Sequence, residues 1–373
     1  MKSCYLFVAK LLCALFMSSA SAQGTSKHST YIYSSASSLS YSEASAVYQM
    51  YNNDWNDYPR TAGTQAFSRN HAALGLKYKN YSIEYRVRTD LSTRFSPDSA
   101  KLLYYYNHEK KVPDGQVFDI DLTARMETSE GARFSFTLPT FLNITVTPYF
   151  SVLKARELQQ GSIQGTFSQP SNKDYVGQGE IHYYSSKDKI FKLPNHLYSD
   201  QSLPNPSGYV YSLDINLKWD YQNFHTDLWL EDAWYNSRWE IANQRDGEID
   251  VNTQLEGLHT QASLKGTASR IRYNPGSMPM FSRLHSYYQW QHWQFGMGAW
   301  HYYGNTFAQA SLAYQFNQHH RLGFTIEDKS HKATVSYQQQ YQHSQLSFTL
   351  GSDRLNLRQA HALELGLTAA LSF

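Results

Sequence analysis

Charged residues recur at every second position in the first half of the chain, and their types and spacing could set an ion preference. Arg86 and Arg88 alternate with Tyr85 and Val87, for example. A period of two places such charges on one face of an extended strand. Rings or patches of charge inside a wet pore select ions. The candidate pore-lining residues are Lys77, Glu84, Arg86, Arg88, Asp119, Asp121, Arg125, Asp214, Lys218 and Asp227.

Few residues are spaced for catalysis or metal binding. His301 is in phase with outward-facing residues but has no obvious Ser partner for lipid hydrolysis. Asp232 or Asp328 with His331 would suit a rim protease, but no motif supports one. Since phosphate loops, zinc spacings and nucleotide motifs are absent, we expect neither an enzyme nor a cofactor. We expect no metal site among the histidines of the predicted short turns, which are His292, His319, His320 and His343.

The first 22 residues have the features of a cleaved secretory signal. Lys2 precedes an apolar run over residues 11–17, and Ala20, Ser21 and Ala22 form a small-x-small cleavage site. Cys4 and Cys13 both lie in this segment, so the expected mature chain has no disulfide and no thiol chemistry. After residue 22, no apolar run approaches the roughly 18 residues of a membrane-spanning helix.

Composition excludes one class of partner and suggests a membrane. Two of the 33 basic residues lie in the signal, which leaves 31 against 31 acidic residues. A formal charge of zero argues against nucleic-acid binding, which needs a basic surface. Aromatic residues make up 15%, with 30 Tyr and 8 Trp, although the mean hydropathy is −0.58. Aromatic belts around an outer-membrane barrel would explain this combination.

Most of the chain alternates apolar and polar residues in segments of about ten, a length that suits tilted membrane strands. Runs such as 333–337 and 346–350 are joined by a short polar turn, which is typical of a hairpin. The sequence predicts an all-β transmembrane antiparallel up-and-down β-barrel of about 16–20 strands. Region 128–175 is too weakly patterned to settle the number. The alternative, a soluble sandwich or propeller, would have shorter strands. Longer connections are expected at 90–100, 186–208, 232–248 and 270–283.

The predicted organisation has three parts. Residues 1–22 are the signal, residues 23–71 an N-terminal segment, and residues 72–373 the barrel. Ser40 and Glu43 form a capping-box pattern, which favours a short helix that plugs or packs on the barrel. An extra strand or a disordered leader fits the segment equally well.

The chain closes on its most regular alternation, "HALELGLTAALSF", with apolar residues at every second position up to Phe373. A closed barrel must pair its last strand with its first, because an open edge in lipid leaves backbone groups unsatisfied. This ending resembles the assembly signal of Gram-negative outer-membrane β-barrel proteins, an amphipathic last strand with a terminal Phe. The resemblance implies recognition by the barrel insertion machinery through Leu367, Leu371 and Phe373.

We therefore expect a multi-pass β-barrel in the outer membrane of a Gram-negative cell. Its expected partners are outer-membrane lipid and lipopolysaccharide, the insertion machinery and polar solutes. The favoured function is a porin-like channel for polar solutes, with export of a surface polysaccharide as a variant. An outer-membrane enzyme acting on lipid or surface peptide, and a structural or adhesin barrel, are the alternatives.

Overall fold

The computed structural model describes residues 30–52, 58–59, 63–108, 110–171, 174–186, 207–252 and 261–373. The predicted signal and most of the predicted long connection 186–208 lie outside these residues. No helix in the described ranges is long and apolar enough to cross a membrane.

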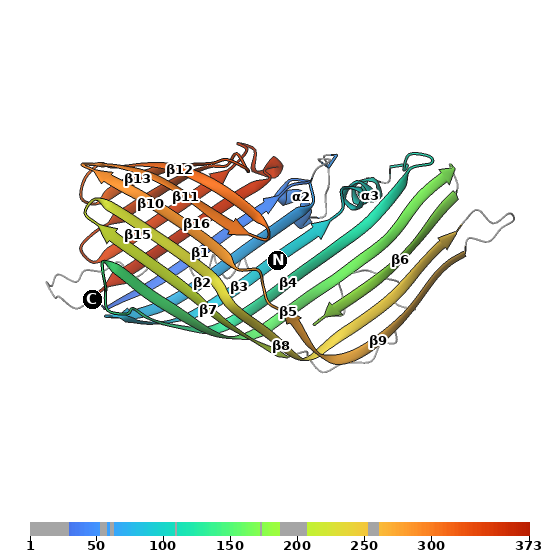
Figure 1. Cartoon of the computed structure of the whole chain (residues 1–373), viewed down its shortest axis with the longest axis horizontal. Helices are drawn as coiled ribbons and strands as arrows, with labels where there is room; N and C mark the ends of the chain where they lie inside the picture. Colours follow the sequence, from blue (N-terminus) through green and yellow to red (C-terminus); the bar gives the residue numbers. More distant parts are fainter. Residues whose placement is uncertain are drawn as a thin grey trace.

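The described chain is dominated by one antiparallel sheet of 16 strands (Figure 1). Hairpins follow one another in sequence, so most neighbours in the sheet are also neighbours in the chain. The strands are β1 (Thr30–Ser42), β2 (Gln65–Tyr78), β3 (Tyr81–Phe95), β4 (Val117–Phe136), β5 (Ile144–Ser171), β6 (Asp174–Ser185), β7 (Gly208–Tyr221), β8 (Phe224–Asn252), β9 (Gln261–Gly276), β10 (Phe281–Trp290), β11 (Trp293–Tyr302), β12 (Asn305–Gln315), β13 (His320–Glu327), β14 (Ala333–Gln340), β15 (Ser344–Ser352) and β16 (Ala362–Ser372).

Fourteen of these strands close into a barrel. β5 and β8 are 28 and 29 residues long, about twice the length of most others. Their first halves contact β7 and β10 in the barrel wall, whereas their second halves contact β6 and β9 beyond it. The all-β antiparallel barrel is therefore confirmed. The closed ring holds fewer strands than the predicted 16–20, because β6 and β9 extend the wall instead of closing it.

The last strand closes the ring as predicted. β16 pairs with β1 in continuous antiparallel register, from Tyr41 opposite Ala362 to Tyr31 opposite Ser372. The backbone N–H of Phe373 also donates to the carbonyl of Thr30 at 2.9 Å. The C-terminal strand is thereby hydrogen-bonded to its end.

The two ends of the barrel differ. One end, here called the short-turn end, carries tight hairpin turns such as those at 79–80 and 291–292, together with the C-terminus. At the other end, β5, β6, β8 and β9 run far beyond the ring and form an extension, at the right of Figure 1. Alternating short and long connections are typical of outer-membrane barrels.

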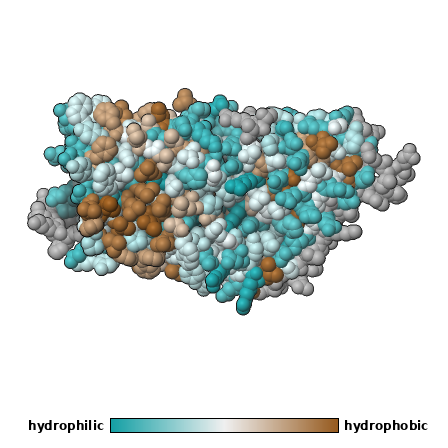
Figure 2. All heavy atoms as spheres, viewed as in Figure 1, coloured by the Kyte–Doolittle hydropathy of each residue, from teal (hydrophilic) through white to brown (hydrophobic). Residues whose placement is uncertain are grey.

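The outer face of the ring is apolar (Figure 2). Leu74, Phe295, Phe324, Phe348 and Leu365 are each 40–49% exposed there. An aromatic belt follows the short-turn end, and its exposed members include Tyr78, Tyr81, Trp219, Tyr221, Phe224, Trp290, Trp293 and Phe316. The extension is more hydrophilic in the same view.

The predicted boundary at residue 72 is wrong, because the ring already begins with β1. Polar serines in β1 obscure its apolar alternation, so the sequence left an extra strand as one of three alternatives, and the structure contains that strand. A short helix does follow, α2 (Val47–Asn52), beside the 3-10 helix η2 (Leu357–Gln359). A second helix, α3 (Pro97–Asn107), is capped by Ser96 and contacts β4 near the extension.

The predicted connection at 232–248 is also wrong, since these residues continue β8. A β-bulge causes the error: Asp232 has a left-handed φ of +57°, and the register with β7 shifts between Leu213 and Ile215. The pairing passes from Ile215 opposite Leu230 to Leu213 opposite Trp234, so the bulge places two extra residues on β8 and the same phase of alternation resumes beyond it. The alternation is interrupted at Asp232, and outward residues beyond it such as Arg238 and Glu240 are polar, so the apolar pattern of the strand is lost at this point.

Candidate functional site: the barrel lumen

Buried ion pairs link distant strands inside the barrel. Arg86 on β3 and Arg133 on β4 both donate to Asp214 on β7, at 3.1 and 2.8 Å. Arg133 also donates to Glu84 at 2.9 Å. We call the full set the charge network; it comprises Arg69, Glu84, Arg86, Arg88, Asp90, Arg133, Asp214, Glu231 and Asp232.

The bulge in β8 supplies two of the acids. Glu231 and Asp232 are consecutive, yet both contact Arg69, at 2.8 and 3.4 Å. Successive side chains of a regular strand point to opposite faces, so this arrangement requires the irregular backbone at Asp232. The same Asp232 carboxylate accepts two hydrogen bonds from Arg88 of β3, while its backbone N–H donates to Asp214 at 2.8 Å.

A second group of interior residues is aromatic and crosses the lumen. β2 and β11 lie seven positions apart in either direction around the 14-strand ring, so they are opposite walls. Nevertheless, the ring centroids of Phe67 on β2 and Tyr302 on β11 are 5.0 Å apart. Side chains of opposite walls therefore touch, and they obstruct the lumen near the end that carries the extension. We call this group the aromatic layer; it comprises Tyr41, Phe67, Phe281, Trp300, Tyr302 and Phe307.

The last two residues of β9 and the connection to β10, together called the loop 275–280, also reach across the interior. The Arg125 guanidinium on β4 donates to the carbonyl oxygens of Pro275 and Ser277, at 3.0 and 3.2 Å. Met278 of this loop is buried against Leu153 and Trp239, among others. Because β5, β6 and β8 separate β4 from β9 in the sheet, these bonds hold the loop 275–280 across the interior and not along the wall.

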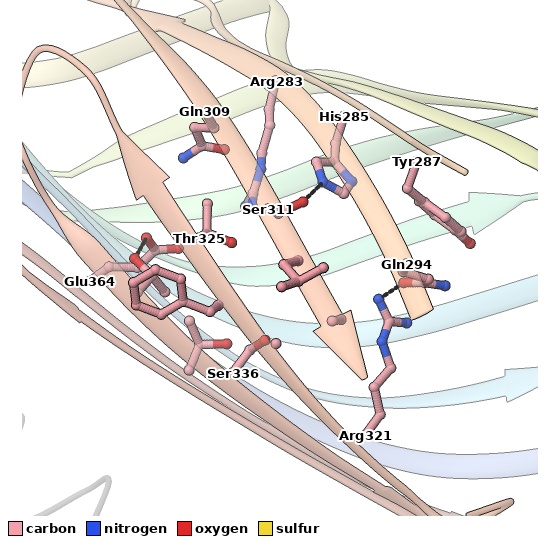
Figure 3. Close-up of a pocket in the computed structure, with 16 residues that line it drawn as sticks. Arg283, His285, Tyr287, Gln294, Gln309, Ser311, Arg321, Thr325, Ser336 and Glu364 are labelled. Carbon is pink, nitrogen blue, oxygen red and sulfur yellow. Dashed lines mark hydrogen bonds between the residues drawn. The ribbon is translucent and has the colours of Figure 1, made fainter. Parts of the chain in front are cut away.

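Between the aromatic layer and the short-turn end lies a polar cavity of about 200 Å³ (Figure 3). Its walls are the inner faces of β10–β16, and twelve of its sixteen lining residues have polar side chains. We call it the lumen cavity. Its polar lining consists of Arg283, His285, Tyr287, Gln294, Gln309, Ser311, Arg321, Thr325, Thr334, Ser336, Thr349 and Glu364.

A glycine shapes one wall of this cavity. His285 Nε2 on β10 lies 3.1 Å from Ser311 Oγ on β12, although β11 runs between the two strands. The position between them on β11 is Gly296, where an added Cβ would lie 2.3 Å from Ser311 Oγ and 2.9 Å from His285 Nε2. A larger residue there would separate the pair, so the absence of a side chain keeps both polar groups in contact across a strand.

The predicted pore-lining residues fall into three groups in the structure. Glu84, Arg86, Arg88, Arg125 and Asp214 face inward, but they are at most 8% exposed and are paired. For these five, the expectation of water-exposed charge is wrong, because the bulge and the side chains of neighbouring strands bring opposite charges together.

The remaining candidates lie at the two ends. Lys77 is partly buried beside the Tyr31 ring, Lys218 is exposed near the short-turn end, and Asp227 accepts a hydrogen bond from Asn216. Asp119 and Asp121 are exposed on β4 beyond the end of β3, so they belong to the extension and not to the lumen. Their role in ion preference stays a prediction.

The extension carries one charged pair with a clear effect on titration. His182 on β6 lies 2.8 Å from Asp246 on β8, and Glu180 is 3.8 Å away. The hydrogen bond to Asp246 raises the pKa of His182 above its ordinary value. This pair lies outside the ring.

The histidines do not form a metal site within the described ranges, where no group of three or more potential ligands occurs. His301 Nδ1 lies 2.8 Å from Thr306 Oγ1. Asp232 belongs to the charge network, whereas His331 contacts Asp328 through the backbone. Sequence reasoning missed the lumen cavity, and the signal that could have suggested it is the small and amide residues of strands β11–β15.

Comparison with solved structures finds other proteins with low sequence identity and TM-scores below 0.5. No family model matches the chain, and no curated protein matches it. The Pseudomonas putida toluene transporter TodX is 8% identical, with a TM-score of 0.46 over 92% of this chain and 90% of that one. The monoaromatic hydrocarbon channel CymD is 8% identical, with a TM-score of 0.45 over 92% and 88%. A Pseudomonas aeruginosa FadL homologue is 9% identical, with a TM-score of 0.36 over 92% and 89%. Such values assign neither a family nor a solute.

Proposed function

We propose that this chain is an outer-membrane barrel of a Gram-negative cell, exported with a cleaved signal. A ring that is apolar outside and hydrogen-bonded without an edge can sit in lipid. The aromatic belt and the short turns would lie at the periplasmic interface, and the hydrophilic extension would project outward among lipopolysaccharide. Leu367, Leu371 and Phe373 on the closing strand would present the signal to the insertion machinery.

We further propose that the barrel passes polar solutes through its lumen. The observation that carries this proposal is the lumen cavity, a polar space inside a ring with an apolar outer face. In a barrel of eight strands, side chains just fill the interior. A barrel of 14 strands is wider, so its interior can hold more than side chains. Since the aromatic layer obstructs the path, we interpret the structure as a closed state of the proposed channel. Passage then requires the layer and the loop 275–280 to move.

One observation favours a second candidate, a structural barrel that conducts nothing. The charge network and the aromatic layer together occupy much of the interior near the extension, as expected for a barrel whose side chains fill it. In that case the lumen cavity would have no path through the barrel. The two candidates differ in permeability. An enzyme remains an alternative only if a reacting group is found, and the expectation of no enzymatic activity stays a prediction.

The test is swelling of liposomes that contain the purified protein, driven by arabinose as a small polar solute. Ser336 lines the lumen cavity, and its neighbour Val335 is 47% exposed on the outer face. We expect swelling above that of protein-free liposomes, a strong reduction by Ser336→Trp and no change by Val335→Trp. Phe67→Ala removes part of the aromatic layer that obstructs the lumen. If neither the wild type nor Phe67→Ala causes swelling, although both are folded in the membrane, the structural barrel is the better interpretation.

A further inference from the structure

Two arginines of the lumen differ from all those in the charge network. Arg283 on β10 and Arg321 on β13 line the lumen cavity together with His285 (Figure 3). All three side chains belong to the lining of this one cavity. Three nitrogen-bearing side chains therefore converge on one small space, from strands on two sides of it.

The arginines of the charge network are neutralised, whereas these two are not. Arg69, Arg86, Arg88 and Arg133 each lie within 3.1 Å of a carboxylate oxygen. Among the described residues, neither Arg283 nor Arg321 forms an ion pair within 4 Å. Arg321 donates instead to the side-chain oxygen of Gln294, a neutral amide that leaves the positive charge in place.

The acids near the cavity already have partners. Glu364 is the one acid in its lining, and its carboxylate lies 2.8 Å from Lys332 and also accepts from Thr334, although it remains within electrostatic range of Arg283. Asp227, opposite His285 on β8, accepts from the neutral amide of Asn216 and so keeps its charge, but it does not line the cavity, and Asp220 lies 2.6 Å from His225. The formally charged side chains that line the cavity are therefore two arginines and one carboxylate, which leaves the lining with a net positive charge. Arg283 is exposed and Arg321 is partly buried, and an excess of one sign of charge beside low-dielectric walls attracts an anion.

The rest of the lining suits a ligand with hydroxyl groups. Tyr287, Gln309, Ser311 and Thr325 offer neutral donors and acceptors around the basic side chains. Gly296 keeps His285 and Ser311 together, so both face the cavity and not the backbone of β11. A guanidinium binds carboxylate and phosphate alike, through paired hydrogen bonds.

We propose that the lumen cavity binds a small hydroxylated anion, a sugar acid or a sugar phosphate, between Arg283 and Arg321. The inference deepens the proposed function by naming the class of solute, and it rests on that function for its physiological meaning. Binding itself can be measured in detergent, without passage across a membrane.

The experiment is calorimetric titration of the purified barrel with glucuronate, glucose 6-phosphate and glucose. The three share a hexose ring and differ in charge. We expect at least one anion to bind with an affinity that falls as salt rises, and glucose to bind at least tenfold more weakly. Binding of glucuronate alone identifies a carboxylate ligand, and binding of glucose 6-phosphate alone a phosphate ligand. Binding of neither anion, or equal binding of glucose, overturns the inference.

Variants assign the site. Arg283→Gln and Arg321→Gln should each weaken anion binding at least tenfold. Arg156→Gln is the matched control, because Arg156 is exposed on β5 and pairs with Glu130 outside the lumen. Equal weakening by the control would overturn the assignment. Heat-modifiable migration on gels shows whether each variant is folded. If a variant is not folded, the salt dependence and the comparison with glucose, both measured on the wild type, decide whether the cavity binds an anion. Anion binding without liposome swelling would refute passage alone, whereas swelling without binding would refute this inference alone.

Discussion

The aromatic layer makes a quantitative prediction about opening, and Phe67 is the residue to change. Its side chain is 2% exposed, and its ring centroid lies 5.6, 5.9 and 5.0 Å from those of Tyr41, Trp300 and Tyr302. Phe67→Ala removes contacts that join opposite walls. Truncation of a buried Phe costs about 3–5 kcal/mol. If the open state lacks these contacts, the closed state alone loses that free energy.

A free-energy loss of this size is a large change in an equilibrium. Since about 1.4 kcal/mol corresponds to a factor of ten, the closed-to-open ratio should fall by roughly 100- to 4,000-fold. A wild-type channel that opens rarely would then be open for a substantial fraction of the time. Single-channel recording in planar bilayers measures this directly, as open probability at fixed voltage.

Phe348→Ala is the matched control. Phe348 is 43% exposed on the outer face of β15, so its truncation removes lipid-facing area but no contact across the lumen. We expect its open probability to match that of the wild type. If Phe67→Ala is folded and inserted but changes open probability less than threefold, the aromatic layer is not the gate. An equal increase for both variants would indicate general loosening of the barrel.

Three further predictions concern the loop, the ending and the topology. Arg125→Gln should release the loop 275–280, because hydrogen bonds to a charged group contribute about 1.5–3 kcal/mol. A cysteine placed at Met278 should then react with a maleimide at least about tenfold faster. An unchanged rate would show that Arg125 does not hold the loop. Deletion of Phe373 should cause poor insertion and periplasmic degradation with normal synthesis, and normal heat-modifiable migration from outer membranes would refute its role in assembly. An epitope tag at Asp114, near the extension, should be reached on intact cells, whereas a tag at Asn317, in a turn at the short-turn end, should require permeabilisation; the reverse result would invert the proposed orientation.

The amino-acid sequence by itself determined the barrel and the face of most strands. Alternation with a period of two is a local property, because each side chain points opposite to its neighbour whatever the rest of the chain does. Leu346, Phe348 and Leu350 could therefore be placed on one face before any strand pairing was known. The closing contact of the last strand also followed, since a lipid-embedded sheet cannot keep an edge.

Only the tertiary structure decided what the inward-facing residues do. Arg88 and Asp232 are 144 positions apart in the chain, and their contact depends on a bulge that interrupts the alternation of β8 at Asp232. Phe67 and Tyr302 touch because the ring size places β2 opposite β11. A period of two shows that a residue faces inward, but not what lies across from it. The charge network, the aromatic layer and the lumen cavity all depend on that second fact, because each is formed by side chains from strands distant in sequence.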